Sequence, residues 1–374
     1  MKTLQIGLEW MPERAGGLPR YYYESWQASH GLYDFRGLVI GSDKVAKTSD
    51  GEVIGFAPAS APLLQRMAKA RQSARAIIAD WKPDLLVSHF ALTTLPVLGV
   101  VDAPLVQQFH GPWALEGQVE GHRGLRYSLK KWTETRVYHR ATRAITLSNA
   151  FADVLARDYG YPADRIDVIP GGVNVSNFNI DSTRSASRRR LGWPEDRPIV
   201  VAVRRLVPRM GLETLIDAAA VLSKRHSDFL IKIAGKGRLA ESLQARITAL
   251  GLENNVELLG FVPDEDLPHA YRAADLSIVP TQSLEGFGLI ALEALAAGTP
   301  VLVSPVGGLP EVVTDLDNRL ILPSPRCEDI VEGLEAALYR GEVPSSADCL
   351  AHAEQFDWKM IATRLRDCYA KAMA

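Results

Sequence analysis

Cysteine is scarce in this sequence of 374 residues. The three cysteines, Cys327, Cys349 and Cys368, all lie near the C-terminus and lack the spacing of metal ligands. Such sparse usage fits a reducing compartment and a chain without structural zinc. We therefore expect no metal site.

Long hydrophobic runs are also missing. Glycine, proline or charged residues interrupt the longest apolar runs well before the roughly 18 residues that a membrane span requires. At the N-terminus, a short strand-like run meets Pro12, Glu13 and Arg14, so the unbroken apolar core of a signal peptide is absent. We expect the mature chain to begin here, and to be cytoplasmic, either soluble or peripheral on the inner face of the cell membrane.

A strong excess of one charge is absent as well. The chain has 42 Lys and Arg against 44 Asp and Glu, a formal net charge of -2. This balance gives no global attraction to nucleic acid or to an anionic membrane, so any such attraction must be local. We expect no nucleic-acid partner.

The segment 122–143 is a local exception to this balance. It has one acid, Glu134, and interleaved apolar residues at Leu125, Leu129, Trp132 and Val137. Its seven basic residues are Arg123, Arg126, Lys130, Lys131, Arg136, Arg140 and Arg143. A basic amphipathic helix can lie on an anionic membrane. The alternative is a surface helix whose apolar side joins the core.

Short apolar runs alternate with longer helix-like stretches along most of the chain, a pattern typical of βαβ units and a parallel sheet. The pattern predicts a Rossmann-like domain at 1–178 and a second at 198–355, with a polar linker at 179–197. We expect the amphipathic tail, about 356–374, to pack back on the first domain. A chain of this length also favours an active site in the cleft between two domains.

The stretch EGFGLIALE carries two acids, Glu285 and Glu293, around a glycine-rich turn. It predicts a helix whose first turn is 286–289, where unpaired N–H groups and the helix dipole suit a phosphate. Eight helical residues span about 12 Å, whereas the carboxylates of a glycosidase lie about 5 to 9.5 Å apart. The spacing therefore favours two grips on one long ligand, with phosphate between them.

The longer segment EGFGLIALEALAAGTPVLVSPVGGLPEVV resembles the signature of the retaining glycosyltransferases of family 4. Further blocks resemble the family in family order, among them VAVRRLVPRMGLETLIDAA, IAGKGRLAESL and NVELLGFVPDEDLPHAYRAADLSIVPT. The resemblance covers nearly the whole chain. It implies the GT-B fold, in which two Rossmann-like domains face a cleft.

The resemblance also implies an activity. Such enzymes move a sugar from a nucleotide-diphosphate sugar, such as a UDP- or GDP-sugar, to a hydroxyl acceptor with retention at the anomeric carbon. The leaving diphosphate is stabilised by a helix dipole and basic side chains, so neither a metal nor another cofactor is expected. The acceptor class stays open between polysaccharide, lipid-linked sugar, glycolipid and small molecule.

Residue roles follow from the same resemblance. The residues matched to the reaction centre are His110, Arg205 and Glu285, where Glu285 holds the sugar hydroxyls. The residues matched to donor binding are Gly16, Gly17, Arg209, Gly235, Val262, Phe287, Gly288, Leu289 and Glu293, of which Glu293 holds the ribose.

One position departs from the family pattern. The family has Lys before Gly211, but this chain has Met210, and a thioether cannot neutralise phosphate. Either Arg209 or Arg204 supplies a second cation, or the site works with Arg205 alone, or the diphosphate is held differently. We favour Arg209, and the competing interpretation of Arg204 is a solvated loop charge.

Several other patterns have simpler interpretations. We interpret His89 as structural, and Asp315 and Asp317 as turn residues despite their metal-type spacing. The run Arg188–Arg190 is interpreted as solvated linker. The three tyrosines at 21–23 cannot all face one side of a helix, so one or two are expected at the acceptor site and the rest in the core.

Two other functions fit the same resemblance. A nucleotide-sugar epimerase of GT-B fold would act on the donor alone. A non-enzymatic sugar-nucleotide binder would keep the clamp and lose the reaction centre; His110, Arg205 and Glu285 speak against it, whereas Met210 speaks for it.

Overall fold

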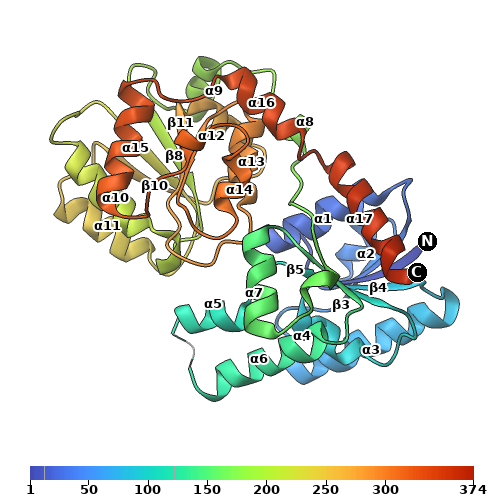
Figure 1. Cartoon of the computed structure of the whole chain (residues 1–374). Helices are drawn as coiled ribbons and strands as arrows, with labels where there is room; N and C mark the ends of the chain where they lie inside the picture. The colour runs from blue at the N-terminus through green and yellow to red at the C-terminus, as the bar shows by residue number, and fades with distance from the viewer. Residues whose placement is uncertain (12, 122) are drawn as a thin grey trace. The chain divides into compact units, whose positions relative to one another are not determined.

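A computed structural model describes residues 1–11, 13–121 and 123–374 of the chain. Pro12 and His122, which belong to the predicted first loop and to the predicted basic segment, lie outside the described residues. The chain divides into two compact units, Met1–Gly172 with Trp358–Ala374, and Val173–Asp357. Each unit is a parallel sheet with helices (Figure 1), so the predicted α/β class is confirmed.

The described part of the first unit contains a seven-stranded sheet of order β3-β2-β1-β4-β5-β6-β7. Every pair of neighbouring strands is parallel. Its central strands β4 and β5 are buried along their whole length, as expected when helices cover both faces of a sheet. The strands are β1 (Lys2–Glu9), β2 (Asp34–Ile40), β3 (Val53–Ala57), β4 (Leu85–Ser88), β5 (Leu105–Phe109), β6 (Arg143–Thr146) and β7 (Ile166–Val168).

The C-terminal helix α17 (Trp358–Met373) belongs to the first unit, as predicted, and lies beside α1 (Gly17–Ser29) in Figure 1. Its indole anchors it, because Trp358 Nε1 donates to Glu24 Oε2 at 2.7 Å. The other helices of this unit are α2 (Lys44–Thr48), α3 (Leu63–Asp80), α4 (Ala91–Thr94), η1 (Leu95–Val97), α5 (Trp113–Val119), α6 (Leu125–Tyr138), α7 (Asn149–Tyr159) and η2 (Ala163–Arg165).

The second unit contains a five-stranded parallel sheet of order β10-β9-β8-β11-β12. Its strands are β8 (Ile199–Val203), β9 (Leu230–Ala234), β10 (Val256–Gly260), β11 (Leu276–Val279) and β12 (Val301–Val303). Its helices are α8 (Val175–Phe178), α9 (Arg184–Leu191), η3 (Pro208–Met210), α10 (Leu212–Leu222), α11 (Ala240–Ala249), α12 (Leu267–Ala273), α13 (Leu289–Ala296), α14 (Leu309–Val313), η4 (Asn318–Leu320), α15 (Cys327–Tyr339) and α16 (Ser346–Glu354).

The segment predicted as a linker, 179–197, is part of the second unit, so that prediction is wrong. It forms helix α9, which packs against α12. The division between the units falls instead after Gly172, before the predicted boundary at 178. The polar composition of the segment suggested a solvated connection, but one of its arginines is a buried anchor.

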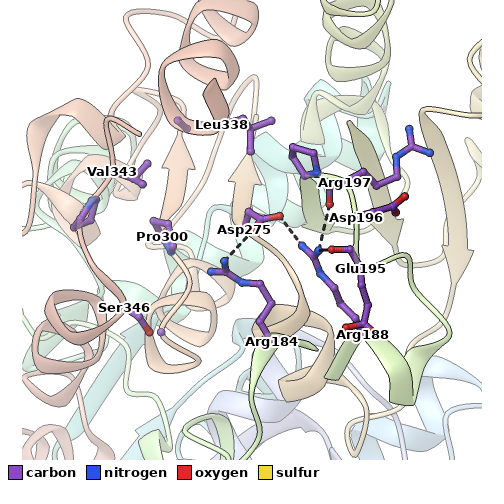
Figure 2. A pocket seen from close by; sticks show the side chains of 14 residues that line it. Arg184, Arg188, Glu195, Asp196, Arg197, Asp275, Pro300, Leu338, Val343 and Ser346 are labelled. Carbon is purple, nitrogen blue, oxygen red and sulfur yellow. Dashed lines mark hydrogen bonds and ion pairs between the residues drawn. The ribbon is translucent and has the colours of Figure 1, made fainter. Parts of the chain in front are cut away.

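That anchor is Arg188, which is only 5% exposed and is therefore not the solvated charge predicted for it. Its Nη2 donates to Asp275 Oδ2 at 2.6 Å (Figure 2), and its Nε donates to the Ala273 carbonyl at 2.9 Å. Arg189 and Arg190 are exposed, as predicted. One buried guanidinium thus ties α9 to the segment between α12 and β11.

We predict that Arg188→Ala lowers the free energy of unfolding by about 3 kcal/mol, because it removes one partner of an ion pair and leaves the Ala273 carbonyl and the Asp275 carboxylate without one of their donors. Urea denaturation of the full chain measures this loss. The neighbouring variant Arg189→Ala is the control, and we expect it to change the free energy of unfolding by less than about 0.5 kcal/mol. Equal effects of the two variants would contradict the anchoring role.

Candidate functional site

The candidate donor residues of the second unit gather at the carboxyl ends of its strands. Neighbouring strands β8 and β11 are not consecutive in the chain, so the connections that follow them run in opposite directions across the sheet. Arg204 and Arg205 come directly after β8, and Glu285 lies in the segment after β11. Ligands of open α/β sheets bind at such a switch point.

Glu285 is held by an ion pair there. Its Oε2 accepts from Arg204 Nη2 at 2.5 Å, and the same nitrogen also donates to Thr281 Oγ1. Burial by itself raises the pKa of a carboxyl group, but the charge and hydrogen bond of Arg204, together with the charges of Arg209 and Arg205, hold the pKa of Glu285 below its usual value. Glu285 is therefore a carboxylate at neutral pH.

Three arginines surround this carboxylate. Arg204 and Arg209 are 8% and 6% exposed, whereas Arg205 is exposed. The interpretation of Arg204 as a solvated loop charge is therefore wrong, because its guanidinium pairs with Glu285. The positive charges of Arg209 and Arg205 also lower the pKa of Glu285, so both guanidiniums lie near its carboxylate.

The position of the missing lysine is filled by a buried side chain. Met210 is 3% exposed and ends the short helix η3. Next to it, Arg209 Nη1 donates to the Leu284 carbonyl at 2.7 Å, one residue before Glu285. Arg209 therefore lies close to Glu285, and its role as the second cation stays a prediction.

The helix after the glycine-rich turn begins later than predicted. Helix α13 starts at Leu289, so Gly286, Phe287 and Gly288 lie in the preceding loop rather than in its first turn. The Phe287 side chain is 2% exposed and lies 5.8 Å from the Phe356 ring, centroid to centroid. The side chain therefore anchors the loop, and only its backbone is left for a ligand.

Gly307 packs against the backbone of Glu285 and was not predicted from the sequence as a site residue. Gly307 has φ +57°, and a Cβ there would lie 2.0 Å from the Glu285 carbonyl oxygen. The next residue, Gly308, donates its N–H to the same oxygen at 3.0 Å. The Gly-Gly pair in PVGGLPEVV was the available signal, and it fixes the backbone of Glu285.

Glu293 lies on α13 and is 5% exposed. The hydroxyl of Tyr271, on α12, donates to Glu293 Oε2 at 3.0 Å. Sequence reasoning missed Tyr271, because no local pattern links it to a glutamate 22 residues later. The hydrogen bond orients this carboxylate, whose role toward a ribose stays a prediction.

The candidate Gly235 and the nearby Gly237, both after β9, have a packing role. A Cβ at Gly235 would lie 1.8 Å from the Arg204 carbonyl oxygen, so only glycine lets the two loops meet. Gly237 approaches the Leu206 carbonyl in the same way. Val262, which follows β10, is half-buried. The two glycines therefore fix the loop that carries Arg204, and the role of Gly235 in binding the donor stays a prediction.

In the first unit, the candidate residues also follow strand ends. Gly16 and Gly17 are exposed at the start of α1, and a Cβ at Gly17 would meet no other atom within 4 Å. His89 follows β4, and His110 follows β5. Because β4 and β5 are paired, the two histidines come together.

The two imidazoles form a hydrogen-bonded pair. His89 Nδ1 lies 3.2 Å from His110 Nε2, and His89 Nε2 lies 2.8 Å from Gln5 Oε1. Since an amide oxygen only accepts, His89 Nε2 carries a proton and His89 Nδ1 accepts from His110 Nε2. His89 is buried, as its structural interpretation requires, and it also sets the tautomer of His110.

Aromatic rings enclose this pair. Tyr21 packs edge-on against His110 at 4.6 Å between centroids, and Tyr22 packs edge-on against His89 at 4.9 Å. Both tyrosines are buried, whereas Tyr23 is half-buried. Burial lowers the pKa of His110 to about 3. Burial also lowers the pKa of His89 well below its usual range, as does the repulsion that a protonated His89 would meet from a protonated His110. Both rings are therefore neutral at pH 7.

The exposed side chains of helix α6 contradict one of the two interpretations of the basic segment 122–143. Leu125, Leu129 and Trp132 are 85%, 60% and 56% exposed, and only Val137 of the four interleaved apolar residues is buried. The prediction that its apolar side joins the core is thus wrong over most of the helix. No helix among the described residues is both long enough and apolar enough to span a membrane.

A cavity of about 450 Å³ lies at the opposite edge of the second sheet, by the amino ends of its strands. Pro198 and Pro300, which precede β8 and β12, line it. Figure 2 shows Arg184 and Arg188 both turned to Asp275. Their guanidinium nitrogens lie 2.9 and 2.6 Å from its carboxylate oxygens. These charges serve the attachment of α9, and none of the predicted site residues lines this cavity.

The described residues contain no group of three or more histidine, cysteine, aspartate or glutamate side chains suited to a metal ion. Asp317, which has metal-type spacing from Asp315, caps the short helix η4 by accepting from the Arg319 N–H at 2.9 Å. Asp317 is therefore a turn residue. The expectation that the reaction needs no metal stays a prediction.

We predict that neither His89 nor His110 gains a proton as the pH falls from about 8 to about 5, because both pKa values lie below that of a free imidazole, about 6.5. Nuclear magnetic resonance of the imidazole carbons measures this, with His89→Gln and His110→Gln used to assign the signals. A titration midpoint of either ring close to 6.5 would contradict the buried neutral pair.

Two families match the chain. Residues 183–353 match the family described as glycosyl transferases group 1, and residues 38–177 match glycosyltransferase family 4. The Anabaena protein HepE, solved in complex with UDP and glucose, superposes with a TM-score of 0.81 at 21% identity, covering 99% of this chain and 100% of that one. This similarity shows the fold, two Rossmann-like units of GT-B type.

Curated relatives extend the comparison. A D-inositol 3-phosphate glycosyltransferase of Saccharomonospora viridis is 34% identical over 252 residues, covering 64% of this chain and 58% of that protein. One of the same name from Segniliparus rotundus is 30% identical over 304 residues, covering 78% and 67%. The chain spans 58% to 61% of the length of the first curated relatives it matches. With both units matched in this way, the chain belongs to the group 1 glycosyltransferases of family 4.

Proposed function

We propose that this chain transfers a glycosyl group from a nucleotide-diphosphate sugar to a hydroxyl acceptor, with retention at the anomeric carbon. The observation that carries the proposal is the carboxylate of Glu285 beside three guanidiniums at the carboxyl edge of the second sheet. A carboxylate accepts hydrogen bonds from sugar hydroxyls, and guanidiniums bind phosphate. The two groups of the donor thus have matching partners in one place.

The leaving diphosphate is the group that develops charge in this reaction. Arg205 and Arg209 are the cations proposed to stabilise it, together with the N–H groups at the start of α13. Met210 stands where the family has a positively charged lysine. In the proposal, Arg205 and Arg209 supply the missing positive charge. In the proposal no metal ion or further cofactor takes part, and the donor is a UDP- or GDP-sugar.

The first unit is proposed to supply His110 to the reaction. Its imidazole is neutral, and its Nε2 proton is engaged by His89, so its Nδ1 is a hydrogen-bond acceptor for a sugar hydroxyl. A neutral ring with this pKa positions the sugar and does not shuttle protons at neutral pH. Glu293, oriented by Tyr271, is proposed to hold the ribose.

The acceptor is proposed to be a hydroxyl of a polysaccharide, a lipid-linked glycan or a glycoconjugate. Relatives named for D-inositol 3-phosphate add a small phosphorylated polyol as a further candidate. A thermal-shift screen with UDP-, GDP- and ADP-sugars identifies the donor first, since ligands that bind the native state raise the melting temperature.

We expect Glu285→Gln to lower kcat roughly 100-fold or more, because the amide removes a charged acceptor that holds the sugar in the transition state. Steady-state transfer with the donor found in the screen measures kcat. Binding of the bare nucleoside diphosphate should change little, since the proposed contact is to the sugar. Anomeric configuration of the product, followed by nuclear magnetic resonance, tests retention.

Other outcomes would refute the proposal. A covalent glycosyl group on Glu285, detected by mass spectrometry, would contradict its role as a hydrogen-bonding clamp. A second sugar nucleotide formed from the donor alone would indicate an epimerase, and donor binding without any turnover would indicate a binding protein.

We further propose a cytoplasmic location with peripheral contact of 122–143 to the inner face of the cell membrane. The stripe Leu125, Leu129 and Trp132 is exposed on α6. The one acid of the segment, Glu134, is 1% exposed and accepts from Tyr159 and Tyr138, so it does not balance the surface charge. An apolar stripe among exposed arginines is complementary to an anionic lipid surface.

We expect the chain to co-sediment with vesicles that contain phosphatidylglycerol and much less with vesicles of phosphatidylcholine, with binding weakened by salt. The double variant Leu129→Ser and Trp132→Ser should bind roughly tenfold more weakly or worse, because it removes the apolar surface that enters the lipid. Leu64→Ser is the control, since Leu64 is 80% exposed on α3. Equal losses in both variants would contradict the assignment to α6.

A further inference from the structure

Arg204 is a buried arginine that comes directly after β8. A buried guanidinium needs a partner, because an unpaired buried charge is costly. Arg204 is 8% exposed, and its partner is Glu285.

The pair distinguishes the two oxygens of Glu285. Oε2 accepts from Arg204 Nη2 at 2.5 Å and lies 3.5 Å from Thr281 Oγ1. Among the interactions of the described residues, each hydrogen bond to this carboxylate is at Oε2. The Glu285 side chain is nonetheless 16% exposed, so the carboxylate is partly open to solvent.

We propose that Arg204 is a positioning residue that binds Oε2 of Glu285 and thereby presents Oε1 as the acceptor for one sugar hydroxyl of the donor. The inference rests on the proposed function, because it concerns the same clamp. A carboxylate fixed on one oxygen loses its rotational freedom before the sugar arrives, so the sugar does not have to order it. Arg204 acts through Glu285 and is not itself required to touch the substrate.

The loop geometry supports this role. The backbone N–H of Arg204 donates to the Ala234 carbonyl at 2.8 Å, and its carbonyl lies so close to Gly235 that no Cβ fits there. On the other side, Gly307 and Gly308 hold the backbone of Glu285. Both ends of the ion pair are thus fixed by neighbouring loops of the same unit.

The test compares Arg204→Gln, Arg204→Lys and the wild type. The charged groups that face Glu285 are Arg204, Arg209 and Arg205, and Arg204 contributes the largest lowering of its pKa. Without Arg204, burial is less opposed and the pKa of Glu285 rises. Carbon-13 nuclear magnetic resonance of labelled glutamate carboxyls, with Glu285→Gln for assignment, measures this pKa without any need for turnover.

We expect Arg204→Gln to shift the titration of Glu285 upward and to move the acid limb of kcat/KM to higher pH by the same amount. It should also lower kcat roughly tenfold or more, the loss typical of one charge-assisted hydrogen bond, while the affinity for the bare nucleoside diphosphate changes little. Arg204→Lys restores the charge without the planar fork, so it should recover the pKa more fully than kcat.

Arg246→Gln is the matched control, because it removes an arginine that pairs with Asp217 on the surface of the same unit. It should alter neither the pKa of Glu285 nor kcat. An unchanged pKa of Glu285 in Arg204→Gln, or a loss of donor affinity that is equal for the sugar nucleotide and the bare diphosphate, would overturn the inference. Thermal unfolding checks that each variant is folded. A wild type with the expected titration but no transfer activity would refute the proposed function and leave the ion-pair assignment supported.

Discussion

Parallel pairing of strands is the constraint on which the candidate site depends. Each parallel crossover returns the chain to the same end of the sheet, so the loops after successive strands meet at one edge. In the second unit this edge brings Arg204, after β8, to Glu285, after β11. In the first unit it brings His89, after β4, to His110, after β5. Residues far apart in the sequence become partners because their strands are neighbours.

The same electrostatic rule explains the charge states of the Arg204–Glu285 pair and of the His89–His110 pair. Burial disfavours a charged group unless a partner compensates it. Glu285 has arginine partners and stays ionised, whereas the two histidines face each other and stay neutral. Glu285 is thus a charged acceptor among cations, and His110 is a neutral hydrogen-bonding ring.

Glycine positions explain how such groups can be set close together. At Gly235 and Gly307 the loops approach so closely that any Cβ would overlap a carbonyl oxygen of Arg204 or Glu285. Gly235, which is predicted to lie near a nucleotide, therefore has a structural task whether or not it also contacts one. The aromatic residues of α1 have a similar supporting task, because Tyr21 and Tyr22 enclose the histidine pair.

The α/β class, the two units and the return of the C-terminal helix to the first unit followed from the sequence alone, because alternating apolar runs and amphipathic stretches reflect local periodicity. The family and the positions of Glu285, Arg205 and His110 in their loops could also be predicted from ordered motifs. The partner of Glu285, the His89 contact, the buried anchor Arg188 and the exposed face of α6 could not. These features depend on which strands and helices are neighbours in space. The sequence does not distinguish a polar residue that faces water from one that faces a buried residue of opposite charge. Tertiary packing alone decided between those two environments. It removes solvent from Arg188 and Arg204 but leaves the next residues, Arg189 and Arg205, exposed.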